Sequence, residues 1–274
     1  MLIFLFTFQC IYCIIDLYEV KNDMREVIDL QENICSIPIN DVFLPKDGCP
    51  MCRMRDMLEE RKAEYITGSA MMEPSVRIKT NEQGFCFRHF EMMVRLGKRL
   101  SNALILESHL QQISEEFVPS IPPRKPDKKK MAALDALLKD CFICRDIKQN
   151  MENMVRIVHA MWISEAEFRQ LYAEQKFICL EHFYLLMNTD QKGLGKNYQA
   201  FYEATSKLAG GYLETLCSDV HHFCSMFDYR SGGSNEWAGS KDSIERSIEF
   251  LTGERIPTEG IEEIQNEEDR ENAK

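Results

Sequence analysis

The sequence of 274 residues has no long hydrophobic run and a shortage of positive charge, and each absence excludes a class of protein. Its most apolar stretch, residues 1–15, is shorter than the roughly 20 residues that span a bilayer, and no Lys or Arg precedes it as in a secretory signal. Lys and Arg number 33 against 44 Asp and Glu, and the net charge of −11 argues against general binding to nucleic-acid phosphates. We therefore expect a cytoplasmic protein, with membrane association through residues 1–15 as the alternative.

Motifs of known catalytic chemistry are also missing. The sequence contains no glycine-rich phosphate loop, no paired-carboxylate motif and no recognisable set of nucleophile, base and orienting residue. We therefore expect no catalytic residue, and we favour a non-enzymatic protein while leaving the question of an activity open.

Composition divides the chain into five segments. Residues 1–30 form an extension outside the fold, of which residues 1–23 precede a second candidate start at Met24. Residues 31–117 and 131–253 form two helical repeats, and residues 118–130, rich in proline and lysine, form an extended linker between them. Residues 254–274 are acidic, lack aromatic residues and predict a disordered tail.

The periodicity of apolar residues predicts helices, and no convincing set of alternating strands is present. Two stripes with helical spacing are predicted to face a core: Phe90, Met93, Gly97, Leu100 and Leu104 in the first half, and Ile147, Met151, Met154, Val158 and Met161 in the second. The predicted fold class is therefore mainly α.

Six of the eleven cysteines and two of the six histidines form an internal repeat. The pair Cys49 and Cys52 is followed by Cys86 and His89, as Cys-x2-Cys and then Cys-x2-His. The second half repeats this order with Cys141, Cys144, Cys179 and His182. Three thiolates and one imidazole can close a tetrahedron around Zn²⁺, so each half is predicted to hold one structural zinc ion with its own four residues.

Other chemistries of the same residues remain open. An iron–sulfur cluster with Cys3His ligation is one alternative, and redox thiols or disulfides are another. A redox dithiol gives no reason for a Cys-x2-His to recur at a nearly constant distance, and the second copy lacks the proline of "CPMC". A zinc deaminase is excluded because no His-x-Glu ligand segment precedes the Cys-x2-Cys pair.

Several residues outside these pairs are candidates for contacts with a ligand or partner. Glu73 and Arg77 lie one helical turn apart and form either such a site or a simple i,i+4 ion pair. Asp228, Tyr229, Arg230 and Trp237 form either an anion or partner pocket or the capping and ion-pairing groups of a final helix.

Three further residues share one predicted helical face. Cys217, His221 and Cys224 are either a third metal site or, as we favour, buried thiols beside a packed histidine. His109 and His159 are expected to be satisfied residues in the core or at its boundary.

The chain resembles a bacterial family of unknown function that has paired Cys-x2-Cys and Cys-x2-His segments. The matching stretches lie between residues 37 and 252: "IPINDVF", "CPMC", "YITGSAMMEPSVRIKTNEQGFCFRHF", "SNALILESHL", "FCSMFDYR" and "EWAGSKDSIERSIEFL". The resemblance implies no activity. Some members carry a transporter substrate-binding label, which this chain does not support because it lacks a secretion signal and two α/β lobes.

The main hypothesis is therefore a zinc-stabilised helical module that binds an unknown protein or small ligand. The alternative is an iron–sulfur or thiol-based redox protein or sensor in which the Cys3His sets are the chemistry. Nucleic-acid binding through "RKPDKKK", residues 124–130, is a third possibility that the net charge disfavours.

Overall fold

The computed structural model describes residues 37–118, 124–227, 237 and 239–257. Within these ranges the regular structure consists of α-helices and short 3-10 helices without strands, which confirms the prediction of a mainly α fold. The predicted extension, most of the acidic tail and the candidates Asp228, Tyr229 and Arg230 lie outside the described residues. No helix in the described part of the chain is long and apolar enough to cross a membrane.

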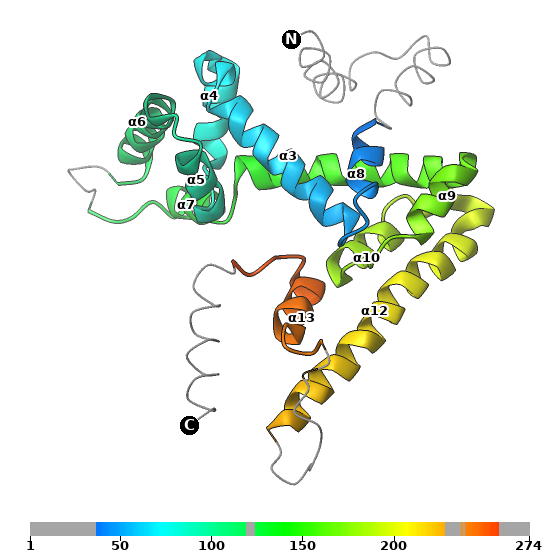
Figure 1. Ribbon diagram of the computed structural model, residues 1–274. Helices are drawn as coiled ribbons and strands as arrows, with labels where there is room; N and C mark the ends of the chain where they lie inside the picture. The colour runs from blue at the N-terminus through cyan, green and yellow to red at the C-terminus, as the bar shows by residue number, and fades with distance from the viewer. Residues whose placement is uncertain (1–36, 119–123, 228–236, 238, 258–274) are drawn as a thin grey trace, which may run out of the picture. The chain divides into compact units, whose positions relative to one another are not determined.

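The chain divides into two compact units that do not follow the two predicted halves (Figure 1). We name the units by their order in the sequence. The inner unit is Arg53–Met154, and the outer unit consists of the residues up to Cys52 and those from Val155 onward. Their boundaries fall within α3 (Pro50–Ile66) and α8 (Phe142–Ser164). The predicted division into 31–117 and 131–253 is therefore a division of the sequence and not of the compact units, because each unit takes residues from both halves.

The inner unit contains most of α3 and six further elements or parts of elements. These are η1 (Ser69–Met72), α4 (Pro74–Gln83), α5 (Phe87–Arg95), α6 (Arg99–Glu116), α7 (Lys128–Leu138) and the first part of α8. α4 packs against α6, as the cyan and green helices of Figure 1 show. The core of the inner unit includes Met54, Leu58, Met93 and Ile105, each less than a tenth exposed.

The predicted stripe from Phe90 to Leu104 is wrong because the helix is broken. α5 ends at Arg95, Gly97 has φ of +73°, and α6 begins at Arg99, which leaves Leu100 71% exposed. Gly97 supplies the left-handed backbone conformation that L-residues adopt only at a cost. The side chain of Asn102 then donates to the carbonyl of Met93 at 2.9 Å and ties the two short helices together.

The lysines of the predicted linker are helical rather than extended. Lys128 to Lys130 form the first turn of α7, because the side chain of Asp127 accepts a hydrogen bond from the backbone N–H of Lys129 at 2.8 Å and caps the helix. No residue of α7 is buried, so the lysines remain solvated as the charge pattern predicts.

The outer unit contains the helical residues 37–43, the end of α8 and the remaining helices. These are α9 (Ala166–Ala173), α10 (Leu180–Asn188), α11 (Gln191–Leu194), η2 (Gly195–Asn197), α12 (Tyr198–Met226) and α13 (Ser243–Thr252). The 29-residue α12 packs against α10 and α13. Figure 1 shows it as the long yellow helix of this unit.

Aromatic side chains fill the core of the outer unit. Phe43 lies 5.1 Å from Phe168 and 5.8 Å from Tyr172 between ring centroids, and Phe177 stacks on Tyr212 at 4.2 Å. The buried hydroxyl of Tyr172 is paired with the hydroxyl of Thr205 at 2.9 Å, which satisfies both polar groups.

The predicted apolar stripe of α8 is confirmed, because every member from Ile147 to Met161 is buried.

Candidate metal centres

All four ligand pairs lie at the first turn of a helix. Cys49 and Cys141 immediately precede α3 and α8, with Cys52 and Cys144 three residues later in the first turn. Cys86 and Cys179 are the N-cap residues of α5 and α10, and their backbone angles are nearly the same (φ −73°, ψ 164° and φ −69°, ψ 164°).

This placement explains why the spacing is the same in all four pairs. A residue just before a helix and the residue three positions later project from the same side of the first turn. The partial positive charge of the helix N-terminus also favours a thiolate there.

The structure joins these pairs across the two halves of the sequence. Cys49 and Cys52 meet Cys179 and His182 in the outer site, and Cys86 and His89 meet Cys141 and Cys144 in the inner site. The predicted pairing of each Cys-x2-Cys with the Cys-x2-His of its own half is therefore wrong. All eight predicted ligands do belong to such a group, but each group draws two from each half.

Helix length gives the physical reason for the exchange. α8 leads the chain roughly 30 Å from Cys144 to Ser164, since an α-helix rises about 1.5 Å per residue. Between Ser164 and Cys179 lie only the eight-residue α9 and short loops. Cys179 could return to Cys144 only if the segment after Ser164 were almost fully extended. It meets Cys49 and Cys52 without such extension.

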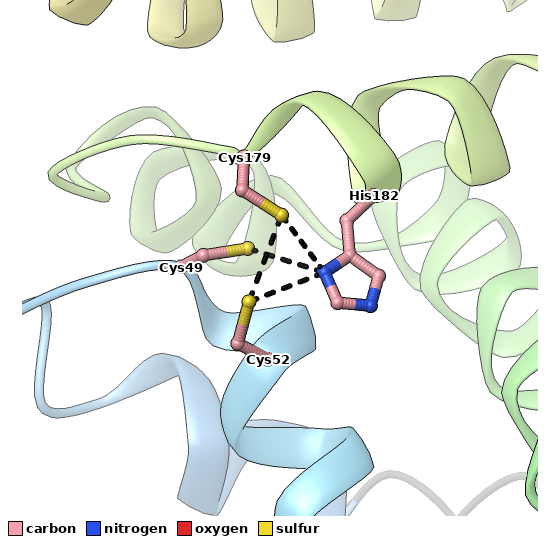
Figure 2. Close-up of side chains that lie close together, drawn as sticks. All are labelled: Cys49, Cys52, Cys179 and His182. Carbon is pink, nitrogen blue, oxygen red and sulfur yellow. Dashed lines mark hydrogen bonds between the residues drawn. The ribbon is translucent and has the colours of Figure 1, made fainter. Parts of the chain in front are cut away.

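The four donor atoms of the outer site surround one point (Figure 2). Nδ1 of His182 lies 3.7 Å from the sulfur of Cys49, 3.3 Å from that of Cys52 and 3.1 Å from that of Cys179. The sulfurs of Cys52 and Cys179 are 3.6 Å apart. All four residues are buried, and the three cysteines are free thiols.

The inner site has the same geometry. Nδ1 of His89 lies 3.1 Å from the sulfur of Cys86, 3.3 Å from that of Cys141 and 3.4 Å from that of Cys144. The sulfurs of Cys86 and Cys144 are 3.8 Å apart. Here the burial is uneven, because Cys144 is exposed and Cys86 is partly exposed.

These separations fit a single tetrahedral ion. Bond lengths of about 2.3 Å to sulfur and about 2.0 Å to nitrogen place sulfurs roughly 3.8 Å apart and sulfur and nitrogen roughly 3.5 Å apart. A disulfide needs about 2.05 Å between sulfurs, so the same distances show no disulfide. Both groups can therefore hold a metal ion.

The pKa values within each site show that neighbouring thiolates would repel one another. Burial alone would raise the pKa of Cys49, but hydrogen bonds from Cys179, Cys52 and His182 lower it well below its ordinary value. The pKa of Cys52 is raised strongly, chiefly by its hydrogen bond to Cys179. One thiol of the site ionises readily while its neighbours resist, since adjacent thiolates repel. A bound cation removes that repulsion and displaces the protons.

The inner site shows the same division. Burial would raise the pKa of Cys141, but the hydrogen bond with His89 and two backbone N–H groups lower it to about 6. Burial would lower the pKa of His89, but Cys141 and Glu59 outweigh it and raise the pKa to about 10. Burial and the neighbouring thiol Cys141 raise the pKa of Cys144.

Glu59 lies beside the inner site and was missed by sequence reasoning. It is 5% exposed, and its carboxylate lies 3.5 Å from Nε2 of His89, on the side of the ring opposite the thiols. Arg88 donates to the same carboxylate at 2.6 Å. Burial alone would raise the pKa of Glu59, but His89 and Arg88 lower it. At 3.5 Å Nε2 of His89 makes no hydrogen bond, but a carboxylate on this side of the ring is placed to orient the imidazole once it binds a metal. Glu59 lies on a helix far from Cys86 in the sequence, so no spacing pattern predicts its position beside His89.

The other described residues that were predicted to make contacts belong to neither group of four. Arg77 donates to the carbonyls of Leu104 at 2.7 Å and Met71 at 3.4 Å, and it forms no ion pair with the exposed Glu73, so the expected i,i+4 pair is wrong. Trp237 packs on Phe223 and Phe227 at 5.4 Å and 6.0 Å.

The final helix uses its charged residues as ion pairs. Arg246 donates to the carboxylates of Asp242 at 2.9 Å and Asp219 at 3.0 Å.

Cys217, His221 and Cys224 are exposed on α12, so the expectation of buried thiols is wrong. They belong to neither of the two groups that could hold a metal ion among the described residues.

The two histidines that were expected in the core, His109 and His159, are only half satisfied. His159 donates from Nε2 to the carbonyl of Leu186 at 3.1 Å, and His109 bonds the backbone of Asn81. In both rings Nδ1 is buried without a hydrogen bond.

The fold and the two sites define a helical protein with two Cys3His groups that can hold metal ions. The chain belongs to a family of unknown function (DUF6062), whose model matches residues 30–258. This membership confirms the resemblance inferred from the motifs.

One similar protein comes from Caldicellulosiruptor sp. (strain Rt8B.4), where it is described as an uncharacterised 23.9 kDa protein in the xynA 3′ region. It is 21% identical over 209 residues, which cover 76% of this chain and 96% of that protein. No solved structure matches the chain.

Proposed function

We propose that each site binds one structural zinc ion and that the protein is a non-enzymatic helical module that binds another protein or a small ligand. The observation that carries the first part is the convergence of four donors in each group, all within 4.8 Å of one another. Four donors complete the coordination that Zn²⁺ prefers, and three of them are thiolates, as in structural sites. No position is left for a substrate or a catalytic water.

The same distances favour a single ion over an iron–sulfur cluster. In a cluster of two or more irons, bridging sulfides and a second metal separate the terminal ligands of different irons. The 4.8 Å limit on donor separation leaves no room for that core without a rearrangement of the helix N-termini. A single iron ion fits as well as zinc, and the two ions differ in their absorption spectra.

Zinc at these positions would stabilise each unit substantially. Structural zinc sites contribute apparent binding free energies of roughly 10–16 kcal/mol. Small domains have only about 5–15 kcal/mol of net stability. Because the outer site joins residues on either side of the inner unit in sequence, the metal closes a contact between segments more than a hundred residues apart.

Elemental analysis and an absorption spectrum of protein purified without oxygen and without added metal test this proposal. We expect two zinc ions per chain and no absorption band in the visible range. Iron with broad absorption near roughly 400 nm would refute structural zinc and support the redox alternative. The variant with Cys217→Ser and Cys224→Ser is the matched control, since it removes two exposed thiols and should retain both ions.

Two exposed apolar side chains support the binding role. Phe87, which follows Cys86, is 82% exposed, and Leu180, which follows Cys179, is 49% exposed. Each site therefore presents an apolar residue at the same step after a ligand. Single exposed apolar residues are common on protein surfaces, so the support comes from the matching positions of Phe87 and Leu180 and not from their exposure alone.

Site-specific photocrosslinking in the native host tests this surface. A photoreactive residue at position 87 should give a discrete adduct, and one at the exposed control position Lys192 should give none. Equal labelling at both positions, or none at position 87, would refute a contact at Phe87.

A further inference from the structure

The two sites differ in their access to solvent although their donor sets match. In the outer site Cys49, Cys52 and Cys179 are at most 7% exposed. In the inner site Cys141 is 4% exposed, but Cys144 is exposed and Cys86 is partly exposed. A soluble oxidant can therefore reach two sulfurs of the inner site and none of the outer site. Reactivity of a thiolate toward oxidants follows its accessibility as well as its ionisation.

The two accessible sulfurs are also close to each other. The sulfurs of Cys86 and Cys144 lie 3.8 Å apart, while a disulfide bond measures about 2.05 Å. The two residues come from different helices, α5 and α8, and each is at a first turn. A sulfenic acid formed at Cys144 would therefore have a thiolate already beside it.

We propose that the inner site is a peroxide-sensitive thiol pair, in which Cys144 reacts first and forms a disulfide with Cys86. This inference rests on the proposed zinc occupancy of both sites. With zinc bound, the cysteines of the site are thiolates. The thiolate of Cys144 attacks one oxygen of hydrogen peroxide, the O–O bond breaks, and hydroxide leaves to give the sulfenic acid. The thiolate of Cys86 then attacks that sulfur and displaces a second hydroxide. In total two thiolates and one peroxide take up two protons to give one disulfide and two waters, so two electrons pass from sulfur to oxygen.

This reaction releases metal from one site only. Disulfide sulfurs carry no negative charge and bind zinc poorly, so the inner site keeps only Cys141 and His89 as strong donors. The outer site keeps all its thiolates because they are shielded. The protein would thus lose one zinc ion of two and, with it, the metal link between α5 and α8. A dithiol reductant and zinc would restore both.

Peroxide titration of the full chain tests the inference. The background variant carries Cys217→Ser and Cys224→Ser, which removes the two exposed thiols of α12 and leaves both sites intact. Zinc is counted before peroxide and then followed with a chromophoric chelator. Reduced thiols are alkylated at intervals, and disulfides are mapped by mass spectrometry. The peptide that carries Cys10 and Cys13 and the peptide that carries Cys35 are followed apart from those of the two sites.

We expect one zinc ion to leave at least tenfold faster than the other, together with a peptide that links Cys86 to Cys144. Cys49, Cys52 and Cys179 should be alkylated only after denaturation. Equal release of both ions, earlier oxidation in the outer site, or loss of zinc without that disulfide would overturn the inference. Fewer than two zinc ions before peroxide would instead refute the proposed function, and the disulfide map would still measure the difference in access between the sites.

Discussion

Paired ligand substitutions distinguish the exchanged sites from sites built within each half. Replacing one cysteine by serine removes a thiolate that the hydroxyl does not replace at neutral pH. The substitutions Cys52→Ser, Cys86→Ser and Cys179→Ser should each reduce zinc from two ions to one per chain, because each residue belongs to one group of four. The decisive variants are the two doubles that share Cys52→Ser.

The exchanged arrangement gives opposite results for these doubles. Cys52→Ser with Cys179→Ser removes two ligands from the same outer site and should leave one ion, whereas Cys52→Ser with Cys86→Ser damages both sites and should leave none. Since a structural zinc site is worth roughly 10–16 kcal/mol, one missing thiolate is expected to abolish retention during gel filtration against a chelator. The zinc losses of the single variants should therefore not add in the Cys52 and Cys179 double, and they should add in the Cys52 and Cys86 double.

Elemental analysis after gel filtration is the assay, with circular dichroism at low temperature to confirm that the retained unit is still helical. The variant with Cys217→Ser and Cys224→Ser is again the control and should hold two ions. The reverse result, with no zinc in the Cys52 and Cys179 double and one ion in the Cys52 and Cys86 double, would show that each half holds its own ion. It would refute the exchanged pairing.

Three further predictions concern single residues. Glu59→Gln should weaken zinc binding at the inner site about 10- to 100-fold in chelator competition, since it removes the carboxylate that orients the ligating histidine, while Glu60→Gln on the exposed side of α3 should change it little. Burial lowers the pKa of His159 to about 4, below the ordinary value of about 6.5. As the pH falls, the unfolded chain therefore takes up this proton before the folded chain does. The contribution of neutral His159 to the free energy of unfolding is fully present above about pH 6.5 and should fall by up to about 3 kcal/mol toward pH 4. Denaturant unfolding of His159→Gln should lack this share of the pH dependence, and identical pH profiles would contradict the reasoning. Gly97→Ala should destabilise the protein by about 1–2 kcal/mol in the same assay because φ is +73°, whereas Gly210→Ala, in the interior of α12 with open space around it, should stabilise by about 0.5–1 kcal/mol.

The eight candidate ligand residues could be predicted from the sequence because their pairing at helix starts depends on local geometry. A Cys-x2-Cys or Cys-x2-His pair at the start of a helix aims both donors to one side, whatever the rest of the chain does. The apolar stripe of α8 was readable for the same reason, since burial of one helix face follows from its period. The stripe through Gly97 failed because periodicity alone does not detect a break at a glycine in the left-handed conformation.

Nonlocal features required the tertiary structure. Glu59 on α3 reaches His89 on α5 only in the folded chain, and the ion pair expected for Arg77 was replaced by a hydrogen bond to a carbonyl of α6. The exposure of Cys217 and Cys224 likewise follows from which face of α12 meets α10 and α13. Each outcome was a choice between partners distant in sequence, about which local spacing carries no information.

By itself, the sequence determined that the protein is helical and that eight residues form Cys-x2-Cys and Cys-x2-His pairs at helix starts. Only the tertiary structure decided which pairs meet, because the long helix after each Cys-x2-Cys leads the chain away from it and favours the pair from the other half. It also decided that one group is buried and the other partly open, since burial depends on the helices packed around each site and not on the residues within it.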